Sequence, residues 1–158
     1  MGYMTEERLM IKQTAREFTK LAWAGLRDLA SAALRREPYL IPVVGPPGSV
    51  SFMSTPDAQP GYFSIVTNAP AWRNEVAARV IVAMALFPPI ASAPRVRCPA
   101  LYVVGAADTL TPTAVTLKAA RQTRRAEVLS LPGSHFDASL GEQFELAVSA
   151  EPRFWYSA

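Results

Sequence analysis

The last third of the chain alternates short apolar runs with segments of helical periodicity, and this alternation constrains the fold more than any other feature. The run Pro99–Gly105 is apolar on both faces and rich in β-branched residues, which is typical of a buried parallel strand. Thr111–Gln122 begins with a threonine and a proline, which indicate a helix start. A second strand is expected over Ala126–Leu131, and a final helix over about Ala138–Ala150. This order predicts an α/β architecture with a βαβα unit and two parallel strands.

The residues before this unit predict a helical region with an irregular middle. Apolar residues recur at helical spacing from Thr5 to about Arg36, so a long helix is expected there. Proline and glycine punctuate Pro38–Gly61 and predict loops. A second helical pattern covers Ala71–Phe87. We therefore expect residues 1–93 to form a mostly helical region with a Pro/Gly-rich loop, and residues 94–158 to form the βαβα part.

Composition excludes several classes of function. The 158 residues are 50% hydrophobic and 18% charged, which favours a folded domain with a core over a disordered chain. The net charge is +3, but no block of like charges appears, so a nucleic-acid partner is not expected. Cys98 is the single cysteine and His135 the single histidine, so neither a disulfide framework nor a His-rich metal site is expected. No metal or cofactor is implied.

The chain carries no evident membrane or export signal. The uncharged apolar stretch Val80–Pro94 is too short to span a bilayer and is broken by consecutive prolines. The first residues, Met1–Lys12, show no apolar core and no small-residue cleavage site typical of a secretory signal. A cytoplasmic protein without a membrane partner is the expectation.

Two polar residues follow the two expected strands. Asp108 lies in the loop after the first strand, and His135 lies directly after the second. The carboxyl ends of parallel strands meet at one edge of a sheet, so the carboxylate can reach the imidazole. A carboxylate on one ring nitrogen fixes the tautomer and leaves the other nitrogen to act as a base. The simpler alternatives are that Asp108 only caps a turn and that His135 is a surface turn residue.

The segments Arg97–Pro112 and Pro132–Asp137 resemble the C-terminal half of the α/β-hydrolase superfamily. More narrowly, they are similar to dienelactone-hydrolase-like and serine-aminopeptidase-like members. The resemblance implies that Asp108 is the acid and His135 the base of a catalytic triad. It also implies a cap or lid in residues 1–93 and a part of the hydrolase core in residues 94–158.

The chain departs from this family in its nucleophile. The family places a nucleophile elbow, G-x-S-x-G, before the acid, and no such motif occurs in this sequence. Ser49 lies in a Pro-rich loop without a preceding strand, and Ser134 adjoins the histidine on the same backbone. Cys98 precedes its strand and is expected to be a small buried hydrophobe. The interpretation is a truncated, inactive copy of a hydrolase that acts on ester, amide or related acyl bonds of small molecules.

An alternative interpretation is a non-catalytic interaction module. A sheet of two parallel strands leaves unpaired edges, and the strand Leu101–Val104 has no polar side. The chain would then associate through its amphipathic helix and its sheet edge. We expect either self-association or a partner chain that covers the edge.

Overall fold

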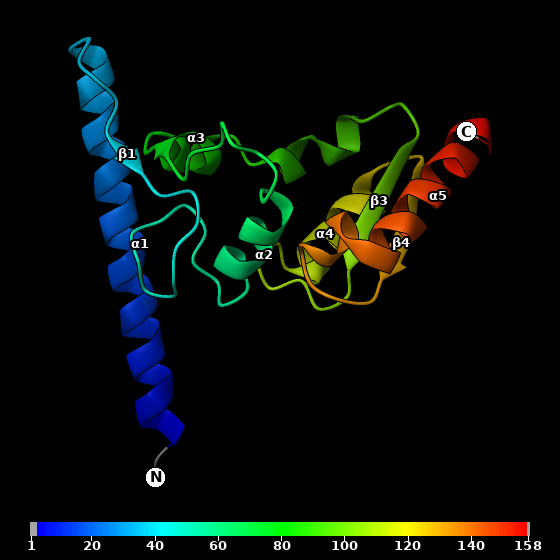
Figure 1. Cartoon of the computed structure of the whole chain (residues 1–158), viewed down its shortest axis with the longest axis horizontal. Helices are drawn as coiled ribbons and strands as arrows, with labels where there is room; N and C mark the ends of the chain where they lie inside the picture. The colour runs from blue at the N-terminus through cyan, green and yellow to red at the C-terminus, as the bar shows by residue number, and fades with distance from the viewer. Residues whose placement is uncertain (1–2, 158) are drawn as a thin grey trace. The chain divides into compact units, whose positions relative to one another are not determined.

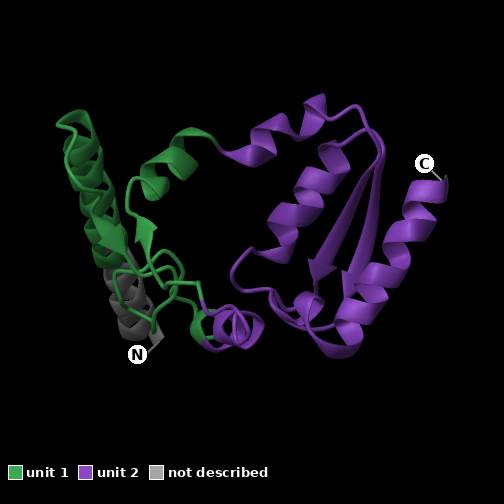
Figure 2. Cartoon of the chain, turned by 45° about the horizontal axis from the view of Figure 1, so that its top comes forward, with its two compact units in different colours: residues 1–59, 71–87 green, residues 60–70, 88–158 purple. Residues whose placement is uncertain are grey.

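The computed structural model describes the backbone of residues 3–157 and the side chains of residues 16–156. Residues 1–59 and 71–87 form one compact unit, and residues 60–70 and 88–158 form the other (Figure 2). Within the described residues, no helix combines the length and apolar character needed to cross a bilayer.

The first unit is built on a long helix and a small antiparallel sheet. Helix α1 spans Tyr3–Ala33 and is the longest element (Figure 1). Strands β1 (Leu40–Ile41) and β2 (Val76–Ala77) pair antiparallel, and α3 (Val80–Leu86) follows β2 directly. The two helices α1 and α3 pack closely, since a Cβ on Gly25 would lie only 2.8 Å from Cγ2 of Val82.

A small apolar core and one buried carboxylate hold this unit together. The core residues are Ala24, Ile41 and Ala78. Asp28 of α1 is fully buried and accepts hydrogen bonds from the backbone N–H of Tyr39 and of Arg79, each at 2.8 Å. The Arg79 guanidinium also donates to this carboxylate, from Nε at 2.8 Å and from Nη2 at 3.2 Å. One side chain therefore fixes the start of β1 and the end of β2 against α1.

The expected helix over Ala71–Phe87 is wrong in its first half, where the chain instead forms β2 and a turn. Tertiary hydrogen bonds explain the difference. The Asn74 side chain accepts from the Val44 N–H and donates to the Val44 carbonyl, both at 2.9 Å. These bonds hold the chain extended beside β1, so helical spacing of the apolar residues is overridden.

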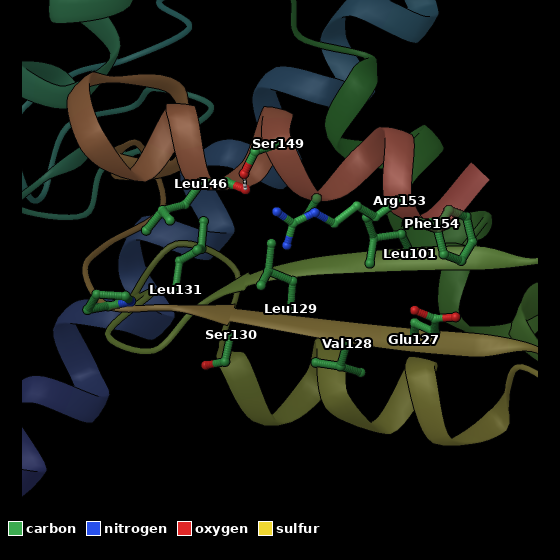
Figure 3. Close-up of a pocket in the computed structure, with 12 residues that line it drawn as sticks. Leu101, Glu127, Val128, Leu129, Ser130, Leu131, Leu146, Ser149, Arg153 and Phe154 are labelled. Carbon is green, nitrogen blue, oxygen red and sulfur yellow. Dashed lines mark hydrogen bonds between the residues drawn. The ribbon is translucent and has the colours of Figure 1, made fainter. Parts of the chain in front are cut away.

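The second unit contains the βαβα arrangement. Strands β3 (Ala100–Gly105) and β4 (Ala126–Leu131) are parallel, with Ala100 opposite Ala126 and Gly105 opposite Leu131. Helix α4 (Thr113–Gln122) and helix α5 (Gly141–Ser157) lie on opposite faces of these strands (Figures 2 and 3). The remaining elements are α2 (Ala58–Ile65), which starts at the boundary of the units, and the 3₁₀ helices η1 (Pro89–Arg95) and η2 (Asp137–Ser139). The α/β architecture with two parallel strands is confirmed.

The bounds of two helices differ from expectation. Helix α4 begins at Thr113 with Pro112 as its N-cap, because the Thr113 hydroxyl donates to the Gly105 carbonyl at 2.7 Å and ties the helix start to the end of β3. Helix α5 continues past Ala150 to Ser157, although Pro152 lies inside it. Phe154 is buried, so packing of the last turns offsets the hydrogen bond that a proline removes.

Candidate active site

The loops after β3 and β4 are held together by backbone hydrogen bonds that continue the ladder of the strands. The Ala106 N–H donates to the Leu131 carbonyl at 2.9 Å, and the Ala107 N–H donates to the Gly133 carbonyl at 2.8 Å. Gly105 permits this approach, since a Cβ there would lie 2.7 Å from the Ser134 carbonyl oxygen. The backbone alone therefore sets the separation between the residues that follow.

Asp108 lies in the first of these loops and is nearly buried, with 10% of its side chain exposed. Its Oδ1 accepts hydrogen bonds from the N–H of Leu110 at 2.9 Å and of Thr111 at 2.7 Å. These bonds orient the carboxylate and leave Oδ2 directed at His135. The distance from Oδ2 to Nδ1 of His135 is 2.8 Å. The structure thus brings together the two residues that the sequence singled out.

The His135 ring is held on one side by aromatic packing and is open on the other. Its side chain is 39% exposed, and the ring meets Phe136 edge-on at a centroid distance of 5.1 Å. Phe136 is buried against Gly61 and Tyr62 of α2, and a Cβ on Gly61 would overlap the Phe136 ring. Among the described residues none forms a hydrogen bond with Nε2 of His135. This nitrogen is the one available to an incoming group.

The loop that carries His135 is shaped by Gly133, which belongs to the turn signal Pro132-Gly133, and by Asp137. The Asp137 carboxylate accepts a hydrogen bond from the Ser134 N–H at 2.5 Å. Gly133 has φ +110°, a conformation that side chains other than glycine rarely adopt, and a Cβ there would collide with Asp137. The Pro132-Gly133 pair is a turn signal in the sequence, but the partner of the turn, Asp137, is visible only in the structure.

The three residues considered as nucleophiles, Cys98, Ser134 and Ser49, lie at different places in the structure. Cys98 lies before β3, at the end of the strand opposite Asp108, and it is exposed, so the expectation of a buried residue is wrong. Ser134 adjoins His135 in the same loop, and its N–H is already held by Asp137. Ser49 belongs to the other unit, where its hydroxyl pairs with that of Ser51 at 2.8 Å. The described residues thus place no hydroxyl or thiol in hydrogen-bond contact with His135.

The arrangement provides an acid–base pair. A carboxylate that accepts from Nδ1–H fixes the ring tautomer and stabilises the imidazolium that forms when Nε2 takes a proton. Residues suited to hold a metal are not grouped here: in the part of the chain that the structure describes, no three His, Cys, Asp or Glu side chains gather. The chemistry that this geometry supports is proton transfer at Nε2.

No family model matches the chain. The quorum-quenching protein AidA of Acinetobacter baumannii is 30% identical over 129 residues, which are 82% of this chain and 42% of AidA. The match thus spans less than half of that relative.

Two solved structures share the fold. A structure of DcsB in complex with its substrate analogue matches 93% of this chain and 52% of that chain, with a TM-score of 0.69 and 21% identity. The α/β hydrolase GrgF from Penicillium sp. sh18 matches 89% of this chain and 49% of that chain, with a TM-score of 0.62 and 18% identity. The chain therefore shares the fold of about half of each of these two structures.

Proposed function

We propose that Asp108 and His135 are the acid and the base of a hydrolase that cleaves ester, amide or related acyl bonds. The observation that carries this proposal is the 2.8 Å contact between Oδ2 of Asp108 and Nδ1 of His135 at adjacent strand ends. In this mechanism Nε2 of His135 removes the proton of a nucleophile that attacks the acyl carbon. The same nitrogen then protonates the leaving group, while Asp108 stabilises the imidazolium.

We further propose that residues 1–93 serve as the cap and residues 94–158 as a part of the catalytic core. The resemblance to dienelactone-hydrolase-like and serine-aminopeptidase-like proteins supports an acyl substrate, and the likeness to AidA supports including quorum signals among the substrates tested. No G-x-S-x-G motif occurs among the 158 residues, so we propose that this chain by itself does not turn over such substrates.

The acid–base pair is tested by nuclear magnetic resonance on the ring of His135, which is the only histidine. We expect the neutral ring to carry its proton on Nδ1, because that nitrogen faces the Asp108 carboxylate. In the Asp108→Ala variant this preference should be lost, whereas Asp137→Ala, which removes a carboxylate that does not touch the ring nitrogens, should retain it. A neutral wild-type ring protonated on Nε2 would contradict the proposal.

An esterase assay tests the lack of turnover. Hydrolysis of short p-nitrophenyl esters by the wild-type chain should not exceed that of the His135→Ala variant, since no nucleophile contacts the described ring. A rate clearly above this control would show that the chain supplies its own nucleophile. The acid–base assignment would then stand, and the proposed inactivity would be wrong.

A second candidate function is a non-catalytic interaction module, and one feature of α1 favours it. On α1, Trp23 and Leu26 are 70% and 55% exposed, and Leu34, directly after the helix, is 62% exposed. Large apolar residues exposed near one another on a helix are typical of a face that another chain covers. A chain with this function would show stable association and no hydrolysis in the assay above.

A further inference from the structure

A groove of about 450 Å³ runs between strand β4 and helix α5, and neither Asp108 nor His135 lines it (Figure 3). All residues of Glu127–Leu131 line it, together with Leu146 and Arg153 of α5. Side chains alternate between the faces of a strand, so Leu129 points toward α5 whereas Val128 and Ser130 point to the other side of β4 (Figure 3). Among the described residues β4 pairs only with β3, so the other edge of β4, which borders the groove, is unpaired.

The backbone at this edge is available for pairing. The Ala100 N–H donates to the Arg125 carbonyl, and the Ala106 N–H donates to the Leu131 carbonyl. In a parallel ladder these two bonds direct the odd-numbered residues of β4 toward β3. The N–H and carbonyl groups of Val128 and Ser130 consequently point away from β3. Pro132 lacks an N–H, so pairing along this edge ends before it.

The groove carries one acidic and one basic side chain that do not pair with each other. Neither Glu127 nor Arg153 forms an ion pair with any side chain that the structure describes. The Arg153 side chain extends along the groove toward Leu129, away from Glu127 (Figure 3). Val128 is 46% exposed and Leu146 is 45% exposed, so the groove also leaves apolar surface uncovered. A partner that fits this groove therefore supplies a β-strand, an apolar side chain, and one acidic and one basic side chain.

We propose that a second copy of this chain occupies the groove, with the two β4 strands antiparallel about a twofold axis at Val128. A twofold contact is self-complementary, so each unpaired group meets its counterpart. Val128 then packs against Val128 of the second copy. Glu127 lies opposite Leu129 of the second copy. Arg153 of the second copy extends toward that leucine, so Glu127 lies next to this arginine. The dimer then contains two ion pairs and a continuous four-stranded sheet. Its formation does not depend on catalytic activity.

The proposal is tested by sedimentation equilibrium of the full chain at micromolar concentrations. The wild type should be a dimer. Glu127→Arg and Arg153→Glu should each weaken dimerisation about tenfold or more, because each change places like charges opposite one another. The double variant with both changes should restore dimerisation close to the wild-type level, which also shows that the altered groove still folds.

Glu145→Arg is the matched control, since Glu145 is an exposed acid of α5 that does not line the groove. It should leave the dissociation constant unchanged. A wild-type chain that stays monomeric would overturn the proposal. So would a dimer that neither Glu127→Arg nor Arg153→Glu weakens, since the copies would then meet elsewhere.

Discussion

Gly133 shows how much of the site depends on one residue without a side chain. Its φ of +110° turns the chain after β4, so that Ser134 meets Asp137 and His135 faces Asp108. Leu131 and Gly133 also accept the backbone bonds that join the two loops. Backbone conformation after β4 thus contributes to the placement of the imidazole, together with the packing of Phe136.

Replacement of Gly133 by alanine should lower the free energy of unfolding by about 2 kcal/mol, because the new Cβ strains the backbone and collides with Asp137. Urea unfolding measures this loss, and the His135 ring signals should shift at the same time. Gly141→Ala is the control: φ is +55° there, but a Cβ meets nothing within 4 Å, so about 1 kcal/mol is expected. Equal costs at the two positions would contradict the role given to Gly133.

At the scale of elements, helix α1 ends in a hydrogen-bond pattern that usually requires glycine. The Arg36 N–H donates to the Ser31 carbonyl at 2.8 Å, and the Arg35 N–H donates to the Ala32 carbonyl at 3.0 Å. This is a Schellman motif with Arg35 in the left-handed region at φ +53°. The sequence predicts a helix to about Arg36, because only Pro38 is visible as a stop signal.

Replacement of Arg35 by glycine should raise the free energy of unfolding by about 0.5–1 kcal/mol, since glycine adopts the left-handed conformation without strain. Thermal unfolding followed by circular dichroism measures the change. Arg36→Gly serves as the control, because among the described residues Arg35 alone has a positive φ without being glycine. A loss of stability in Arg35→Gly would contradict the strain assigned to this residue.

The elements that the sequence predicted well are those whose pattern is local. The bounds of β4 agree with expectation, and the strand and loop positions sufficed to predict that Asp108 meets His135. The strands β1 and β2 were missed because each is only two residues long and depends on distant partners. Asp28 was missed for the same reason: its hydrogen bonds reach Tyr39 and Arg79, which no local pattern in α1 indicates.

At the scale of the whole molecule, acid stability depends on the buried carboxylate of Asp28. Burial opposes ionisation and by itself raises the pKa of this group. The hydrogen bonds from the Arg79 side chain and from the N–H groups of Arg79 and Tyr39, together with the guanidinium charge, lower the pKa of Asp28 below its ordinary value. The folded chain therefore binds this proton less readily than the unfolded chain does. The resulting stabilisation is fully present above about pH 4 and is lost as the pH falls through the folded pKa.

The Asp28→Asn variant should be less stable than the wild type by about 3 kcal/mol at pH 7, because it leaves Arg79 without its charged partner. Urea unfolding at pH 7, 5 and 3 measures how this difference shrinks as acid protonates Asp28 in the wild type. Glu75→Gln removes the exposed pair with Arg73 and should change stability by less than about 0.5 kcal/mol. A difference between Asp28→Asn and the wild type that stays constant with pH would rule out this linkage.

The backbone hydrogen bonds of Ala106 and Ala107 to the neighbouring loop limit how this part of the sequence can change during evolution. Each bond fixes a position along the chain rather than a type of side chain. Substitutions at these alanines would leave the bonds in place, whereas a single-residue insertion or deletion before Asp108 would carry its carboxylate out of register with the imidazole. Homologous proteins that retain the Asp108–His135 pair should therefore vary in the residue types of this stretch but keep its length unchanged.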